Sequence, residues 1–163
     1  MSLNIQIIAI GTRMPDWIDQ GVKEYLKRIP RGVKLSLVEI SASHRSSGAK
    51  NKGIPSETAR ESEAELILQK VQGVDRVIAL DERGKGVPTK ELAVFLDDLQ
   101  MQAMSLAFVI GGPDGLSDKV LERANLRWSL SQMTFPHALV RVILVEQIYR
   151  ALMINANHPY HRE

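Results

Sequence analysis

The 163-residue chain contains no cysteine and no apolar run long enough to cross a membrane. The lack of cysteine excludes disulfides, thiolate metal sites and thiol nucleophiles. Its N-terminus also lacks the charged start and the cleavage site of a signal peptide, so we expect a cytoplasmic protein with no membrane contact. Hydrophobic residues make up 44% of the sequence. This composition predicts one soluble globular domain, residues 1–163, with a substantial core.

Acidic residues are scarce in the first third of the chain. Residues 1–52 carry nine Lys and Arg against four Asp and Glu, whereas the remainder carries twelve against fifteen. The uneven charge suggests a polyanionic partner, although a solvated surface that keeps the protein soluble explains it more simply. The candidate phosphate contacts are Arg28, Arg31, Lys34, Arg45, Lys50 and Lys52. Three of these lie in residues 41–56, an expected loop without acids whose role stays open.

Short apolar runs alternate with stretches of helical spacing along the chain. The runs that predict strands cover residues 4–12, 34–40, 76–84, 106–112 and 127–135. The stretches that predict helices cover residues 16–29, 57–72, 89–104, 117–124 and 137–154, the third with Thr89 as its cap. This alternation predicts an α/β fold with a mainly parallel sheet and helices on both faces. Ligands of such sheets bind at the carboxyl ends of the strands.

The glycine-rich stretch GGPDG, residues 111–115, follows one of the predicted strands. It matches neither the dinucleotide fingerprint nor the P-loop. Pro113 removes an N–H group that a phosphate would need, and Asp114 places negative charge where an anion would sit. The stretch therefore suits a neutral or cationic ligand approached closely by backbone atoms. The alternative is a tight turn that only joins strand to helix.

Two further strand ends carry loops that can meet this one. The stretch LDERGKG, residues 80–86, is a second loop with glycines, and SLSQMTFPH, residues 129–137, ends another predicted strand. If the strands are neighbours, the three loops converge on one pocket. Asp81, Glu82 and Asp114 then either act on a positive charge in the ligand or cap helices, and the sequence leaves both roles open.

Several motifs resemble the bacterial ribosomal RNA large-subunit methyltransferase H family, small members of the SPOUT superfamily. They are LDERGK, FVIGGPDGL, WSLSQMTFPHALVRVILVEQIYRA, NHPYHRE and the N-terminal GTRMPDWIDQGVKEYLKRIP. The resemblance covers nearly the whole chain. It implies a C-terminal trefoil knot, which general rules of chain topology would not suggest. It also implies a homodimer that binds S-adenosyl-L-methionine and methylates N3 of a pseudouridine in 23S rRNA of assembled ribosomes, in the stem-loop that meets the decoding site.

The resemblance also implies which residues contact the cofactor. By motif these are Leu80, Gly111, Leu130, Ser131, Gln132, Met133, Thr134 and Phe135. A sulfonium methyl is already activated, so the protein needs mainly to align an in-line attack and remove a proton. We therefore expect no metal. His158 and His161 are only a weak metal signal, with a proline between them.

The C-terminal stretch NHPYHRE holds the candidate catalytic residues. An imide nitrogen such as N3 is a poor nucleophile until it loses its proton, so the site needs a base. The hypothesis is that His158 or His161 accepts the proton, while Tyr160 and Arg162 place the base and a phosphate. The alternative is an untidy chain end without function.

Residues near the last predicted helix have more than one interpretation. We expect the helix dipole to keep His137 neutral in a pocket-shaping role. Glu146 and Arg150 are spaced for an ion pair within the helix. Alternatively, Arg141 and Arg150 face a second subunit or RNA, because the helix is otherwise apolar. Two other functions stay in view: a non-catalytic ribosome-binding module, and a nucleotide-binding α/β enzyme that the absent phosphate motifs disfavour.

Overall fold

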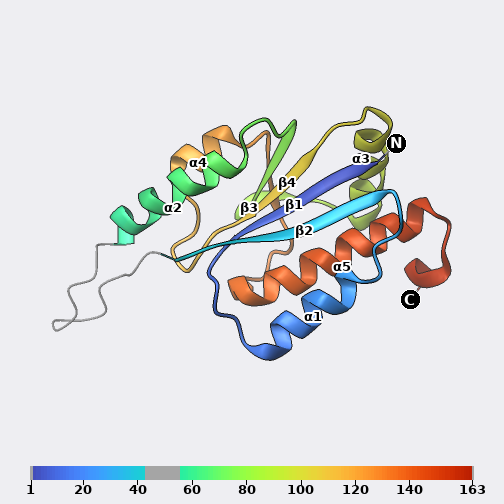
Figure 1. Ribbon diagram of the computed structural model, residues 1–163, viewed down its shortest axis with the longest axis horizontal. Coiled ribbons are helices and arrows are strands. Elements are labelled where there is room, and N and C mark those ends of the chain that lie inside the picture. Colours follow the sequence, from blue (N-terminus) through green and yellow to red (C-terminus); the bar gives the residue numbers. More distant parts are fainter. Residues whose placement is uncertain (1, 43–55, 163) are drawn as a thin grey trace.

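The structure is a computed structural model that describes residues 2–42 and 56–162, without the side chains of Ser56, His161 and Arg162. Strands and helices alternate along the described chain (Figure 1). The strands are β1 (Leu3–Ile10), β2 (Val33–Ile40), β3 (Arg76–Gly86), β4 (Leu106–Ile110) and β5 (Leu126–Ser129). The helices are α1 (Asp16–Leu26), α2 (Ser56–Lys70), α3 (Thr89–Met101), α4 (Asp118–Arg123) and α5 (His137–Asn155), followed by the 3₁₀ turn η1 (Pro159–Arg162).

The strands form one sheet in the order β2-β1-β4-β3-β5, and every pairing is parallel. Helices α1, α3 and α5 pack with one face of the sheet, and α2 and α4 with the other. Figure 1 shows α1 and α5 side by side below the sheet, with α2 and α4 above it. The predicted α/β class, the parallel sheet and the helices on both faces are confirmed.

The two halves of the core form on opposite faces of the sheet, because successive side chains of the central strands point to alternate faces. In β1, Leu3, Ile5 and Ile7 join the cluster under α1, α3 and α5, whereas Ile8 and Ile10 face α2 and α4. All five residues of β4 are buried. Strands buried on both faces need such continuous apolar runs, and this is why the short apolar stretches predicted them correctly.

Some predicted boundaries were wrong. β5 ends at Ser129, and residues 130–135 form a loop instead of continuing the strand. Thr89 does not cap α3; it is the first helical residue, after Pro88, and its hydroxyl lies 2.6 Å from Oε1 of Gln147. Proline fits just before a helix because it has no N–H to leave unsatisfied. Most of the loop expected at residues 41–56, with the candidate phosphate contacts Arg45, Lys50 and Lys52, lies outside the described residues.

Within the described part of the chain, no helix is both long and apolar enough to span a bilayer.

Candidate cofactor pocket and C-terminal tail

The three predicted loops meet in one cavity of about 550 Å³ at the carboxyl ends of β3, β4 and β5. The sheet register brings them together, because Leu80 of β3 pairs with Ile110 of β4 and with Trp128 of β5. The lining residues are 80–83, 110–116 and 128–131, then 133–137, with Arg60 and Val140. The expectation that β3 and β4 are neighbours whose loops converge is confirmed.

The glycine-rich stretch is a tight turn and also a wall of the cavity. The amide of Gly115 donates to the carbonyl of Gly112 over 3.0 Å, with Pro113 and Asp114 between them. A Cβ on Gly111 would lie 2.8 Å from the carbonyl carbon of Gly115. The turn therefore needs glycine at position 111 for its own closure, whatever ligand the cavity holds.

The end of β3 folds tightly against β5. Both Leu80 and Lys85 pair with Trp128, so the four residues between them bulge out of the register. A Cβ on Gly84 would lie 2.7 Å from the carbonyl carbon of Arg127. Only glycine allows two backbones to approach this closely.

The structure brings most of the predicted cofactor contacts to this cavity. Those that line it are Leu80, Gly111, Leu130, Ser131, Met133, Thr134 and Phe135. Gln132 is not among the lining residues. The loop is ordered by its own serines: the Ser129 hydroxyl donates to the carbonyl of Ser131, and the Ser131 hydroxyl accepts from the amide of Met133.

The cavity wall carries charges of both signs. The Asp81 carboxylate accepts from the amide of Arg83, and Glu82 lies 3.4 Å from the hydroxyl of Thr134, so neither acid caps a helix. From α2, Arg60 reaches the opposite wall and donates to the carbonyl of Asp114 over 3.4 Å. Sequence reasoning missed Arg60, because it lies 20 residues before the nearest of the three loops.

His137 and Arg141 occupy the first turns of α5. Burial, and then the charge of Arg141, lowers the pKa of His137, which favours the neutral ring through burial instead of the expected helix dipole. The expectation that Arg141 faces a partner or RNA was wrong: it is only 1% exposed. Its guanidinium donates to Glu39 over 2.6 Å and to the carbonyls of Ile10 and Gly11. Arg141 therefore ties α5 to the ends of β1 and β2.

A second cavity of about 430 Å³ shares Leu80, Trp128 and Phe135 with the first and continues toward α3. Thr89 and Gln147 line it, and their side chains are hydrogen bonded to one another. The same Gln147 amide donates to Glu146 over 2.6 Å. A line of polar contacts thus leads from this cavity to the outer side of α5.

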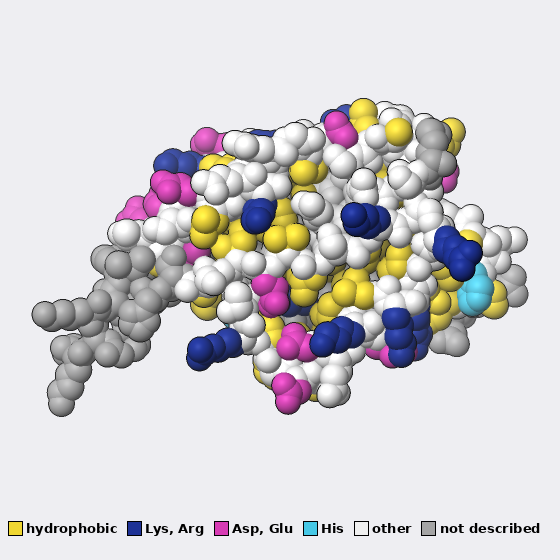
Figure 2. All heavy atoms as spheres, in the orientation of Figure 1, with side chains coloured by type: hydrophobic (Ala, Val, Ile, Leu, Met, Phe, Trp, Pro, Cys, Tyr) yellow, Lys and Arg dark blue, Asp and Glu magenta, His cyan; other side chains and the backbone are white. Residues whose placement is uncertain are grey.

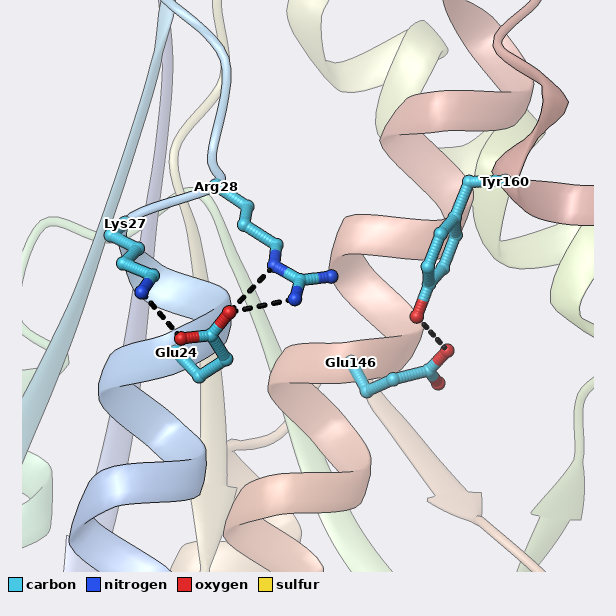
Figure 3. Close-up of polar contacts among 5 residues, drawn as sticks. All are labelled: Glu24, Lys27, Arg28, Glu146 and Tyr160. Carbon is cyan, nitrogen blue, oxygen red and sulfur yellow. Dashed lines mark hydrogen bonds and ion pairs between the residues drawn. The ribbon is translucent and has the colours of Figure 1, made fainter.

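At the end of this line, Glu146 holds the C-terminal tail, residues 156–162. The Tyr160 hydroxyl lies 3.2 Å from Oε1 of Glu146 (Figure 3), which also accepts from Nε of Arg150 over 2.8 Å. The predicted ion pair between Glu146 and Arg150 is confirmed. The Tyr160 ring packs edge-on against Tyr149, with centroids 4.7 Å apart, and under the guanidinium of Arg150. Burial raises the pKa of the Tyr160 hydroxyl, which keeps it protonated as a donor.

The tail and the first cavity lie at opposite ends of α5. His137 and Val140 line the cavity at the start of the helix. The amide of His158 donates to the carbonyl of Met153, which lies 13 residues after Val140. At a rise of 1.5 Å per residue, Val140 and Met153 are about 20 Å apart along the axis of α5. One copy of the chain therefore does not bring the exposed His158 to its own cavity.

The described part of the chain holds no group of three or more His, Cys, Asp or Glu side chains placed to bind a metal ion.

Comparisons with known proteins agree along nearly the whole chain. A family model described as "Predicted SPOUT methyltransferase" matches residues 3–161. A ribosomal RNA large subunit methyltransferase H from Hahella chejuensis is 44% identical over 161 residues, covering 99% of this chain and all of that protein. Its namesake from Legionella pneumophila is 45% identical over 160 residues, covering 98% and 99%.

Solved structures give the same fold at low sequence identity. A probable methyltransferase from Bordetella pertussis superposes with a TM-score of 0.59 at 14% identity, covering 91% of this chain and 93% of that one. A probable methylase family protein from Haemophilus influenzae gives a TM-score of 0.54 at 14% identity, covering 96% and 69%. At such identity the likeness concerns the fold alone.

Proposed function

Because this chain belongs to the ribosomal RNA large subunit methyltransferase H family of SPOUT methyltransferases, we propose that it transfers a methyl group to 23S rRNA. Within 23S rRNA, the proposed target is N3 of a pseudouridine. The proposed substrate is the assembled ribosome in the cytoplasm. The observation that carries the proposal is the convergence of three strand-end loops on one cavity, in a chain that matches its relatives from end to end.

The cavity suits S-adenosyl-L-methionine as methyl donor. Its volume lies in the range of ordinary small-molecule sites. The ligand combines an apolar adenosyl group, a sulfonium cation, an amine and a carboxylate. Apolar Leu80, Trp128 and Phe135 fit the first, Asp81 and Glu82 fit the positive groups, and Arg60 fits the carboxylate. The proposed contacts are Leu80, Gly111 and residues 130–135, and we add Arg60 because it lines the cavity.

The cofactor, when bound, supplies a methyl group on a good leaving group. The chain's own residues must orient it, exclude water and take the proton from the imide nitrogen of the base. We assign proton removal to His158 or His161, and placement of base and phosphate to Tyr160 and Arg162. The ordered docking of Tyr160 on α5 supports a tail with a defined role, because untidy chain ends are rarely held by several contacts.

The separation of tail and cavity supports a homodimer. His158 lies about 20 Å along the helix from the level of Val140. The active unit is accordingly two protomers, with the tail of one meeting the cavity of the other. The partly exposed Leu139, Val142 and Ile143 of α5 suit such an interface. We further propose the trefoil knot of this family, in which the segment after β5 threads past the end of β3.

Methyl transfer to ribosomes tests the proposed function. Ribosomes that lack the modification are incubated with the protein and S-adenosyl-L-methionine labelled in the methyl group, and the labelled nucleoside is identified after digestion. We expect 3-methylpseudouridine from 23S rRNA. Ribosome binding without any transfer would instead favour a non-catalytic ribosome-binding module.

A further inference from the structure

A group of cations lies on the outer side of the molecule, away from the cavity. This basic face is made of the end of α1, the connection after it and the start of β2, and all its cations are exposed. Figure 2 shows Lys and Arg side chains over α1 and β2. The members of the basic face are Lys23, Lys27, Arg28, Arg31 and Lys34.

The basic face has a strong excess of positive charge. Residues 23–34 contain five Lys and Arg and one acid, Glu24. Glu24 contacts Lys27 over 2.5 Å and Arg28 over 2.6 Å (Figure 3). Among the described residues, Lys23, Arg31 and Lys34 have no acidic partner within ion-pair distance. These three cations therefore remain for an external anion. The other two cations of the basic face, Lys27 and Arg28, are paired with Glu24.

The basic face is continuous with the C-terminal tail. The guanidinium of Arg28 lies 5.3 Å from the ring centroid of Tyr25 and 6.0 Å from that of Tyr149. The ring of Tyr149 in turn packs against the ring of Tyr160 in the tail. Figure 3 shows Arg28, just after the end of α1, and Tyr160, from η1, on the two sides of the same turn of α5. The exposed Arg28 therefore lies close to Tyr160 of the tail, with the buried Tyr149 in contact with both.

We propose that the basic face binds backbone phosphates of the rRNA whose base the tail acts on. This inference rests on the proposed function, and it specifies which surface of the protein contacts the RNA backbone. Exposed Lys and Arg on one face are the usual phosphate contacts of RNA-binding proteins, and they position the nucleic acid without reading its sequence. In the homodimer, the RNA contacts the basic face and tail of one protomer and reaches the cavity of the partner.

The test neutralises the three cations without acidic partners. The variant Lys23→Gln/Arg31→Gln/Lys34→Gln is compared with Lys70→Gln/Lys90→Gln/Lys119→Gln, which removes the same charge from exposed positions on α2, α3 and α4. Affinity for unmodified ribosomes is measured at several KCl concentrations with S-adenosylhomocysteine present, so that no transfer occurs. Thermal unfolding and S-adenosylhomocysteine binding check that each variant is folded.

The first variant should bind ribosomes about tenfold or more weakly, and the slope of log affinity against log salt should become shallower by about 2 to 3. The second variant should keep the wild-type slope and affinity, because the lost charges lie elsewhere. Equal behaviour of the two variants would overturn the basic face as the RNA site. If the wild type itself neither bound nor methylated ribosomes, the proposed function would fail as well.

Discussion

The hydroxyl of Tyr160 lies 3.2 Å from Oε1 of Glu146, 14 residues earlier in the chain. The same carboxylate accepts from Arg150 and from Gln147, so one acid fixes the tail, a cation and the side chain that lines the second cavity. Glu146 is therefore a positioning residue for the proposed catalytic tail.

Glu146→Ala should slow methyl transfer to ribosomes by about 10- to 100-fold, because a displaced tail loses the geometry that the reaction needs. The dissociation constant for S-adenosyl-L-methionine, measured by calorimetry, should stay unchanged. The control is Glu122→Ala, which alters an exposed acid of α4. Unimpaired transfer by Glu146→Ala would show that the tail does not need this anchor.

Removal of the tail gives a complementary result. A chain truncated after Asn157 should still bind S-adenosyl-L-methionine, since the residues that line the first cavity all precede this point. It should lose transfer to ribosomes, because the candidate bases His158 and His161 are gone. Full activity of the truncated protein would refute a catalytic role for the tail.

Arg60 provides a test of how the methyl donor lies in the cavity. Arg60→Gln should weaken binding of S-adenosyl-L-methionine by about 10- to 100-fold, the usual effect of losing a hydrogen bond between charged groups. Binding of 5′-methylthioadenosine, which has no carboxylate, should hardly change. Calorimetry with both ligands distinguishes the outcomes. An equal loss for both ligands would mean that Arg60 shapes the cavity and does not contact the carboxylate.

The contact between Glu39 and Arg141 predicts a stability effect. Glu39→Gln leaves the buried guanidinium without its counter-charge and should lower the free energy of unfolding by about 1–3 kcal/mol. This decrease in the free energy of unfolding should be smaller than for a fully buried ion pair, because the Glu39 side chain is 34% exposed. Urea denaturation measures it, with Glu122→Gln expected within about 0.5 kcal/mol of wild type. A similarly small change in Glu39→Gln would contradict the proposed role of the pair.

The lowered pKa of His137 predicts that the stability of the protein depends on pH. Its pKa is lowered in the folded protein, so below about pH 6.5 the unfolded chain binds a proton that the folded chain does not. The free energy of unfolding should therefore fall as the pH drops below this value, and His137→Asn should flatten part of the fall. Urea denaturation between pH 5 and pH 8 measures both, with His158→Asn as control. Identical pH profiles for wild type and His137→Asn would contradict the assignment.

The sequence predicted the layers and the loops that form the cavity. Strands such as β4 are buried on both faces, so a short apolar run that ends at Gly111 identifies this strand without tertiary information. The three loops converge because parallel strands end at the same edge of a sheet, which is a general rule of the architecture.

Residues that depend on contacts across long chain separations were not predictable. Arg141 looked like a surface cation on an apolar helix, yet it contacts Glu39 and the carbonyls of Ile10 and Gly11, more than 100 residues away. Arg60 reaches the cavity only because α2 packs over the turn at Asp114. A local pattern carries no information about such partners.

If the cavity of one protomer works with the tail of its partner, two variants that are inactive alone should restore activity when they are combined. Thr134→Trp fills the cavity from an exposed position, and truncation after Asn157 removes the tail. Each variant alone should transfer no methyl group to ribosomes. When the two are co-expressed and dimers form at random, about one quarter of wild-type activity should return, because half of the dimers carry one complete site. Activity no higher than that of the separate variants would contradict the claim.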